Sequence, residues 1–253
     1  RMFQVLERFE MWDELIHLSE TMYLEPTNLK QEQDKRIRAL GTAYFEKSDS
    51  PQLLAQLVEL QGRLVQAQNE QTEAQNEAAK KAKEAKKPAA EIDKAKAAAG
   101  KKFNNRIKSL NNAVAELNAY AGLLVGTTET SKTLLGQVSG VAKDRLARLY
   151  LRAGDHEKAE RLAGEAVESA KNEVIPLANQ IDVLFRIGKE KEASEAFAKL
   201  REISGDIDDL THAPFQRLSE IASAIDFPSD WRIERQLSHD VGMRPSLDSI
   251  GPL

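Results

Sequence analysis

The stretches DRLARLYLRAGDHEKAERLAGEAVESA (144–170) and ANQIDVLFRIGKEKEASEAFAKLREIS (178–204) decide the fold class, because they repeat one pattern of small and apolar residues. A glycine stands where a first helix must end in a left-handed cap, and an alanine lets a second helix approach the first closely. Because both copies follow the pattern with the same spacing, they predict an all-α array of helix–turn–helix units. Corresponding positions stand 34 residues apart: Tyr150 and Leu184, Gly154 and Gly188, Ala159 and Ala193, Ala166 and Leu200.

This pattern resembles the tetratricopeptide repeat, whose units stack into an α-solenoid. The resemblance covers residues 140–225 well and residues 1–60 loosely. It implies a non-catalytic scaffold for protein–protein interaction, in which the first helices of successive units form a groove for a peptide or a helix. The polar positions of these helices are the candidate groove residues: Lys143, Arg148, Asn179, Asp182 and Arg186.

The same period extends the array in both directions. One more step of 34 residues leads from Ile181 to Phe215, which predicts a capping helix over about 214–225. We therefore assign residues 133–228 to repeats with a capping helix, and residues 1–50 to divergent helices of the same kind. Trp231 follows the capping helix, and we expect this large aromatic side chain to cover the end of the array.

Residues 51–126 follow a different rhythm, with apolar or small residues at alternating steps of four and three. Two such seams flank Pro88, which predicts a long antiparallel coiled-coil hairpin with each arm about 55 Å long. Pro88 suits the first turn of the returning helix, and Gly100 predicts a break in that helix. Pairing across the hairpin places residues opposite each other as follows: Leu53 and Leu124, Leu60 and Leu117, Ala67 and Leu110, Ala74 and Phe103.

The hairpin tip near residues 86–88 is rich in lysine. The segment 79–102 has nine lysines and three acidic residues, whereas the whole chain has a net charge of −4. A solvated face is the first interpretation, and an electrostatic tether to an acidic partner or anionic surface is the second. Nucleic-acid binding is disfavoured because the segment has no arginine and no aromatic residue; self-association through the hairpin stays open. The candidate tether residues are Lys80, Lys81, Lys83, Lys86 and Lys87.

Composition and spacing give no cofactor, metal or catalytic residue. The chain has no cysteine, which excludes disulfides and thiol centres within it, and its four histidines have no helical partner at metal-ligand spacing. The segment GTTETSKT (126–133) departs from a phosphate-binding loop at Ser131 and follows a predicted helix rather than a strand. We interpret it as a polar connector, and we predict no enzymatic activity in these residues. No apolar run is long enough to span a membrane, and the compartment stays undecided.

The last residues, DVGMRPSLDSIGPL (240–253), have no helical periodicity. They are similar to the segment that precedes the redoxin domain in bacterial proteins joining a tetratricopeptide region to a thioredoxin-like or peroxiredoxin-like module. The similarity implies that residues 229–253 are a linker to a C-terminal domain beyond Leu253, and that the chain is the recruitment or regulatory region of a thiol-redox enzyme. We therefore expect a longer parent protein.

Overall fold

The computed structural model describes residues 2–204, 209–225, 227–228 and 230–232 of the 253-residue chain. These residues form eleven α-helices and no strand, which confirms the all-α prediction. In chain order the helices are α1 (Met2–Arg8), α2 (Trp12–Ser19), α3 (Lys30–Glu46), α4 (Ser50–Glu84), α5 (Ala89–Val125), α6 (Thr128–Leu135), α7 (Lys143–Arg152), α8 (His156–Ser169), α9 (Val174–Arg186), α10 (Glu190–Ser204) and α11 (Ala213–Ala224).

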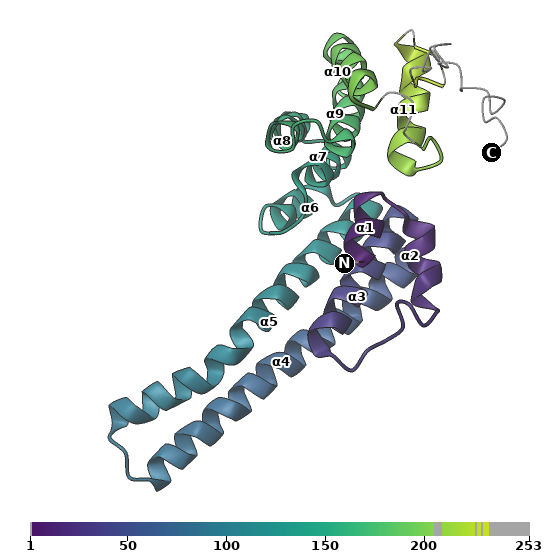
Figure 1. Ribbon diagram of the computed structural model, residues 1–253. Helices are drawn as coiled ribbons and strands as arrows, with labels where there is room; N and C mark the ends of the chain where they lie inside the picture. The colour runs from purple at the N-terminus through teal and green to yellow at the C-terminus, as the bar shows by residue number, and fades with distance from the viewer. Residues whose placement is uncertain (1, 205–208, 226, 229, 233–253) are drawn as a thin grey trace, which may run out of the picture.

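The helices are arranged as consecutive pairs. Each odd-numbered helix up to α9 packs against the even-numbered helix that follows it. Odd-numbered helices also pack on one another, in the order α1–α3–α5 and α7–α9–α11. A hydrogen bond from Arg145 Nη2 of α7 to Tyr120 Oη of α5 (3.0 Å) links these two series. We call the odd-numbered helices the inner helices, and the side of α7, α9 and α11 that is turned toward α1 the inner face (Figure 1).

The turns within the α7–α8 and α9–α10 pairs are closed in the same way. Gly154 (φ 75°) and Gly188 (φ 82°) take the left-handed conformation that the sequence predicts at these two positions. The amide after each glycine donates to a carbonyl five residues earlier, as a helix-ending Schellman motif requires. These bonds are Asp155 N–H to Tyr150 O and Lys189 N–H to Leu184 O, both 2.9 Å.

The turn between α3 and α4 repeats this geometry without a glycine. Ser48 takes the left-handed position (φ 58°), and Asp49 N–H donates to Tyr44 O (2.8 Å). The Asp49 side chain then accepts from Gln52 N–H (3.2 Å), which caps the start of α4. The local hydrogen bonding of α3–α4 therefore matches that of α7–α8, where Asp155 caps α8 in the same manner.

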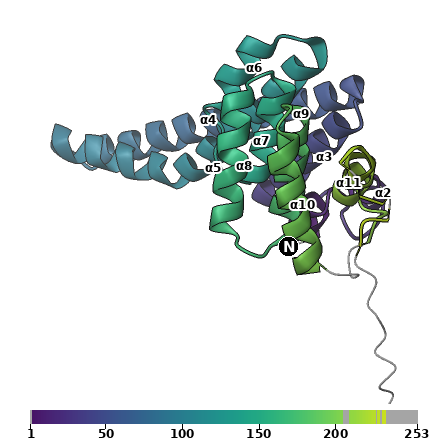
Figure 2. The same cartoon turned by 90° about the horizontal axis from the view of Figure 1, so that it is seen from above.

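Helices α4 and α5 form an antiparallel hairpin that projects from the other helices (Figures 1 and 2). Helix α4 is continuous over 35 residues, from its pairing with α3 out to the hairpin tip. Leu60 and Leu117 are fully buried in the shared core. Further out, Gln71 Nε2 donates to Asn104 Oδ1 (2.7 Å). The predicted pairs have residue numbers that sum to 177, which assigns Gln71 to Arg106, two residues away from Asn104.

Two details of the hairpin differ from the prediction. Pro88 is the residue before the returning helix and not part of its first turn, since α5 begins at Ala89. Gly100 does not break the returning helix, which runs through it to Val125. An added Cβ on Gly100 would meet the end of the flexible Gln75 side chain of α4, so the Gln75 side chain lies directly against this glycine.

The segment 126–133, expected to be a polar connector, is mostly helical. Helix α6 begins at Thr128 and packs against the end of α5. Ser131 and Leu135 of α6 are buried, and an added Cβ on Gly122 of α5 would collide with Ser131 Oγ. Small residues thus let α6 lie against α5. The pairs α3–α4 and α5–α6 are consecutive, and the hairpin is formed by the outward extension of α4 and α5, the helices through which these pairs are connected.

The far end of the array is closed by α11 and by Trp231. Helix α11 packs on α9, at the place where the 34-residue period predicts a capping helix. Trp231 is fully buried and packs edge-on against Phe197 (5.5 Å between ring centroids) and near Phe215 (6.0 Å). Arg201 Nε donates to Trp231 O (2.6 Å). Trp231 therefore has the covering role that the sequence predicts.

Candidate binding surface on the inner helices

Glu10, in the turn between α1 and α2, lies at the centre of a buried ionic cluster on the inner face. Its Oε1 accepts from Arg148 Nη1 of α7 (2.7 Å) and from Arg217 Nη2 of α11 (3.0 Å). Its Oε2 accepts from Arg217 Nη1 (2.7 Å). Only 9% of Glu10 is exposed. Two arginines from different helices therefore hold a carboxylate that is remote from both in the sequence.

The surroundings of Glu10 favour its charged form. Burial by itself raises the pKa of a carboxyl group, but the charges of Arg148 and Arg217 outweigh burial and lower the pKa of Glu10 from 4.5 to about 2. Glu10 also has a left-handed backbone (φ 54°), which costs a non-glycine residue about 1 kcal/mol. The ion pairs thus stabilise a residue whose backbone conformation favours glycine.

Asn179 of α9 extends the Glu10 cluster. Its Oδ1 accepts from Arg217 Nη2 (2.9 Å), and its Nδ2 donates to Asp144 Oδ2 of α7 (3.0 Å). Asp144 also accepts from Arg8 Nη1 of α1 (3.2 Å). Side chains of α7, α9 and α11 therefore form one connected network with residues 8–10 of the N-terminal end.

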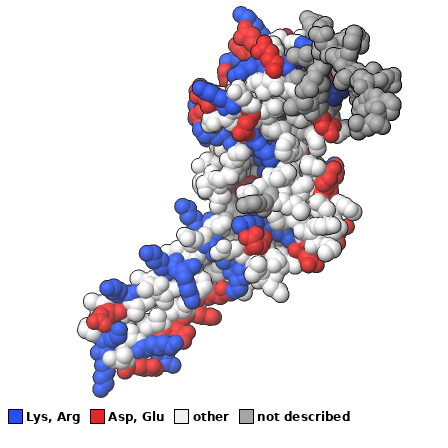
Figure 3. Space-filling model, in the orientation of Figure 1, with Lys and Arg blue, Asp and Glu red and all other residues white. Residues whose placement is uncertain are grey.

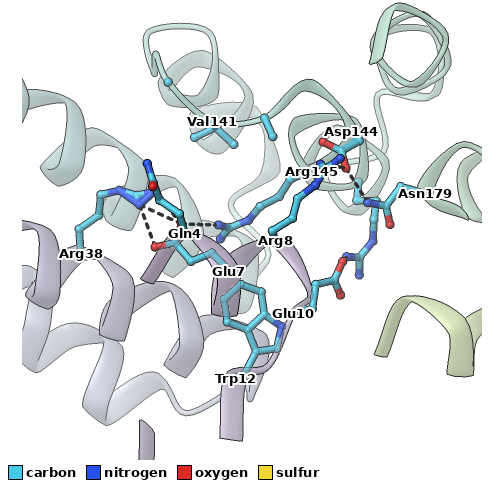
Figure 4. A pocket seen from close by; sticks show the side chains of 13 residues that line it. Gln4, Glu7, Arg8, Glu10, Trp12, Arg38, Val141, Asp144, Arg145 and Asn179 are labelled. Carbon is cyan, nitrogen blue, oxygen red and sulfur yellow. Dashed lines mark hydrogen bonds and ion pairs between the residues drawn. The ribbon is translucent and has the colours of Figure 1, made fainter. Parts of the chain in front are cut away.

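A second ionic cluster surrounds Glu7, one turn before Glu10 (Figure 4). Arg38 Nη2 of α3 donates to Glu7 Oε2 (3.1 Å), and Arg145 Nη1 lies 3.8 Å from the same oxygen. The Arg145 guanidinium also lies over the Trp12 ring, 5.3 Å from its centroid. Both clusters border a cavity of about 160 Å³, which has room for a few water molecules.

A larger cavity of about 380 Å³ adjoins the Glu10 cluster at Arg148 and Arg217. We call it the arginine cavity. Asp182 accepts there from Arg186 Nε (2.6 Å), and Arg152 Nη1 donates to Glu46 Oε2 (3.1 Å). The residues that line the arginine cavity are Arg148, Leu151, Arg152, Asp182, Arg186 and Arg217.

The structure brings together four of the five predicted groove residues. Arg148, Asp182 and Arg186 line the arginine cavity, and Asn179 belongs to the Glu10 cluster. Asn179 and Asp182 are buried, so in this conformation they contact side chains of the same chain and not solvent. Lys143 lies apart from the other four, and its Nζ binds Glu165 Oε2 of α8 (2.8 Å).

Sequence reasoning missed several residues of this surface, among them Arg152, Arg217 and Glu10. Arg152 follows Arg148 by one helical turn, and this spacing is a signal that the sequence does carry. Arg217 lies on the predicted capping helix, where we expected packing alone. No local pattern points to Glu10, because a glutamate in a short turn is typical of an exposed position.

The lysines of the hairpin tip lie at the outer end of the hairpin, among a few acidic residues (Figure 3). Lys81 Nζ pairs with Glu77 Oε1 (2.5 Å), and Lys87 Nζ pairs with Glu91 Oε2 (3.3 Å). Both pairs are exposed, and such pairs contribute little stability. Within the described part of the chain, no ion pair or hydrogen bond of the side chain involves the remaining three candidates: Lys80, Lys83 and Lys86.

Other classes of site find no support among the residues that the structure describes. None of their helices is both long and apolar enough to cross a membrane. They contain no group of three or more His, Cys, Asp or Glu side chains placed to hold a metal ion. The redoxin-like segment 240–253 lies outside the described residues.

Comparison with known proteins does not assign a family. No family model, no curated protein and no solved structure matches the chain. The resemblances to tetratricopeptide repeats and to redoxin-linked proteins therefore stay predictions.

Proposed function

We propose that the chain is a protein-interaction scaffold that binds a partner segment along its inner face, as the resemblance to tetratricopeptide repeats implies. The Glu10 cluster carries this proposal. Side chains of α7, α9 and α11 converge there on residues 8–10, a segment that comes from the other end of the sequence. The inner face thus already binds one segment of the same chain through charged side chains.

The contacts of this piece support an acidic partner. Helix α1 packs on α2 and α3, whereas residues 8–10 contact the inner face through the ion pairs Glu10–Arg148, Glu10–Arg217 and Arg8–Asp144. A partner carboxylate would find the same guanidinium groups, which bind carboxylates with two parallel hydrogen bonds. We infer that acidic side chains of the partner enter beside or in place of Glu10.

A peptide selection tests the proposal. A pool of random ten-residue peptides is passed over the immobilised full chain, over Arg186→Glu in the arginine cavity, and over Arg161→Glu as a control. Arg161 lies on α8 and pairs with Glu165 of the same helix, away from the inner face. We expect the full chain and the control to enrich acidic peptides and Arg186→Glu to lose them. Enrichment that is equal in all three proteins would contradict the proposal.

A second candidate function is an electrostatic tether through the hairpin tip, and the three unpaired lysines favour it. Amines that form no ion pair or hydrogen bond within the described residues remain available to an anionic partner. Replacing Lys80, Lys81, Lys83, Lys86 and Lys87 with glutamate should abolish sedimentation with phosphatidylserine vesicles and leave acidic-peptide binding unchanged. Sedimentation that survives the replacement, or that is absent from the unmodified chain, rules the tether out for a lipid surface.

A further inference from the structure

The arginine cavity is lined by four guanidinium groups from three inner helices. Arg148 and Arg152 come from α7, Arg186 from α9 and Arg217 from α11. The three carboxylates that contact them are Glu10, Asp182 and Glu46. The cavity therefore has one more positive than negative group around it, and residues 8–10 do not fill it.

Many donors of these arginines have no acceptor among the described residues. Arg186 donates only from Nε, to Asp182, so both of its Nη atoms have no hydrogen bond. Arg148 and Arg152 each donate only from Nη1. Arg217 Nε is buried without a hydrogen-bond partner. Arg148 Nε and Arg217 Nε lie 3.5 and 3.6 Å from Asp182 Oδ2, whereas the partly exposed guanidinium groups of Arg152 and Arg186 are open to solvent. The donors that are not bound to a carboxylate are therefore accessible to an acceptor-rich ligand in the cavity.

The number and the origin of the donors indicate the ligand. Each of the four arginines contributes at least one donor without an acceptor, and the four come from three different helices. A carboxylate has two oxygens in one plane, whereas a phosphate group has acceptor oxygens pointing in several directions and carries up to two negative charges. Arginine forks match phosphate well. The cavity of about 380 Å³ also leaves room for the group to which a phosphate is attached.

We propose that the arginine cavity is a phosphate-binding site that takes a phosphate monoester group. The group can belong to a phosphorylated side chain of a partner segment on the inner face or to a small phosphorylated molecule. The first source rests on the proposed scaffold function, and the second does not. Glu10 holds Arg148 and Arg217 in place beside the cavity, and Arg186, whose side chain is about half exposed, lies at its entrance.

A phosphorus NMR titration of the full chain tests the site. Inorganic phosphate, O-phosphoserine and acetate are compared at constant ionic strength. We expect phosphate and phosphoserine to broaden or shift on adding the chain, and acetate not to displace them. Arg186→Gln should weaken phosphate binding about tenfold, which is the loss of one charge-assisted hydrogen bond, and Arg186→Lys should weaken it less. Arg161→Gln is the matched control on α8.

The outcomes separate the possibilities. Absence of phosphate binding to the unmodified chain, or an equal affinity of Arg186→Gln and Arg161→Gln, overturns the site. Displacement by acetate as effective as displacement by phosphoserine overturns the assignment to phosphate. Circular dichroism of each variant shows whether it is folded. If Arg186→Gln does not fold, Arg186→Lys, which keeps the positive charge, takes its place in the comparison. Acidic-peptide selection can succeed while phosphate binding fails, so the scaffold function is judged independently.

Discussion

Arg217 holds both carboxylate oxygens of Glu10 although 207 positions separate the two residues. This pair joins the last described helix to the first turn of the chain, and Arg148 reinforces it. We expect Glu10→Gln to lower the free energy of unfolding by about 3 kcal/mol, because it removes the charge that Arg148 and Arg217 share and leaves them only their longer contacts with Asp182. Urea denaturation measures the loss. Glu14→Gln, at an exposed position of α2, is the control, and an equal effect of the two changes would disprove the role of Glu10.

The lowered pKa of Glu10 predicts an acid sensitivity. Because its folded pKa is about 2 and its ordinary value is 4.5, its contribution is complete above pH 4.5 and is lost as the pH falls through about 2. That contribution corresponds to about 3 kcal/mol. The difference in unfolding free energy between the unmodified chain and Glu10→Gln should therefore shrink steadily from pH 5 to pH 2. A difference that does not change with pH would contradict the assigned pKa.

The two equivalent helix-ending turns predict opposite effects for removing a glycine and for introducing one. Gly154 has a left-handed backbone with open space around its Cα, so Gly154→Ala should cost about 1 kcal/mol through backbone strain alone. Ser48 has the same conformation without being glycine, so Ser48→Gly should stabilise the chain by a few tenths to 1 kcal/mol. Thermal unfolding of both variants measures the shifts. Shifts of the same sign would show that backbone conformation does not govern these turns.

The middle of α5 is fixed to α3 by a buried ion pair. Arg106 Nε of α5 donates to Asp34 Oδ2 (2.8 Å), and both residues are less than a tenth exposed. Asp34→Ala should destabilise the chain by about 3–5 kcal/mol, because Arg106 stays buried without its partner. Chemical denaturation checks this, with Asp93→Ala at the exposed tip as the control. A loss as small as that of the control would mean that Arg106 finds another acceptor.

Trp231 predicts a large packing effect at the end of the array. Its ring is fully buried against Phe197 and Phe215, so Trp231→Ala should lower the unfolding free energy by about 3–5 kcal/mol. Trp231→Phe should recover most of this loss. Urea denaturation of both variants measures the change. A stability of Trp231→Ala that matches the unmodified chain would place Trp231 outside the core.

The sequence predicted those elements whose pattern is local. The glycines at 154 and 188 and the seams around Pro88 are signals within one or two helices, and the structure has the corresponding turns and the hairpin. Helix α6 was missed because its eight residues, TETSKTLL, are mostly polar. Its position depends on the contact between Ser131 and Gly122, and no periodicity reveals such a contact.

The candidate site was predictable only in part for a similar reason. Arg148, Asp182 and Arg186 line one cavity, and the 34-residue spacing predicted that they lie on neighbouring helices. Their functional setting depends on Glu10 and Arg217, whose approach follows from how the array closes and not from any spacing in the chain. A buried charge network of this kind is a long-range property, so composition and periodicity alone cannot predict it.

Helix α4 belongs both to the pair with α3 and to the hairpin, and no break separates the two parts. It is therefore a rigid lever of about 50 Å, with its pivot among the helices that also form the core. Any ligand that anchors the tip would exert a torque on the contact between α3 and α4. Conversely, a rearrangement of the helices around α3 would move the hairpin tip over a much larger distance than the helices themselves move.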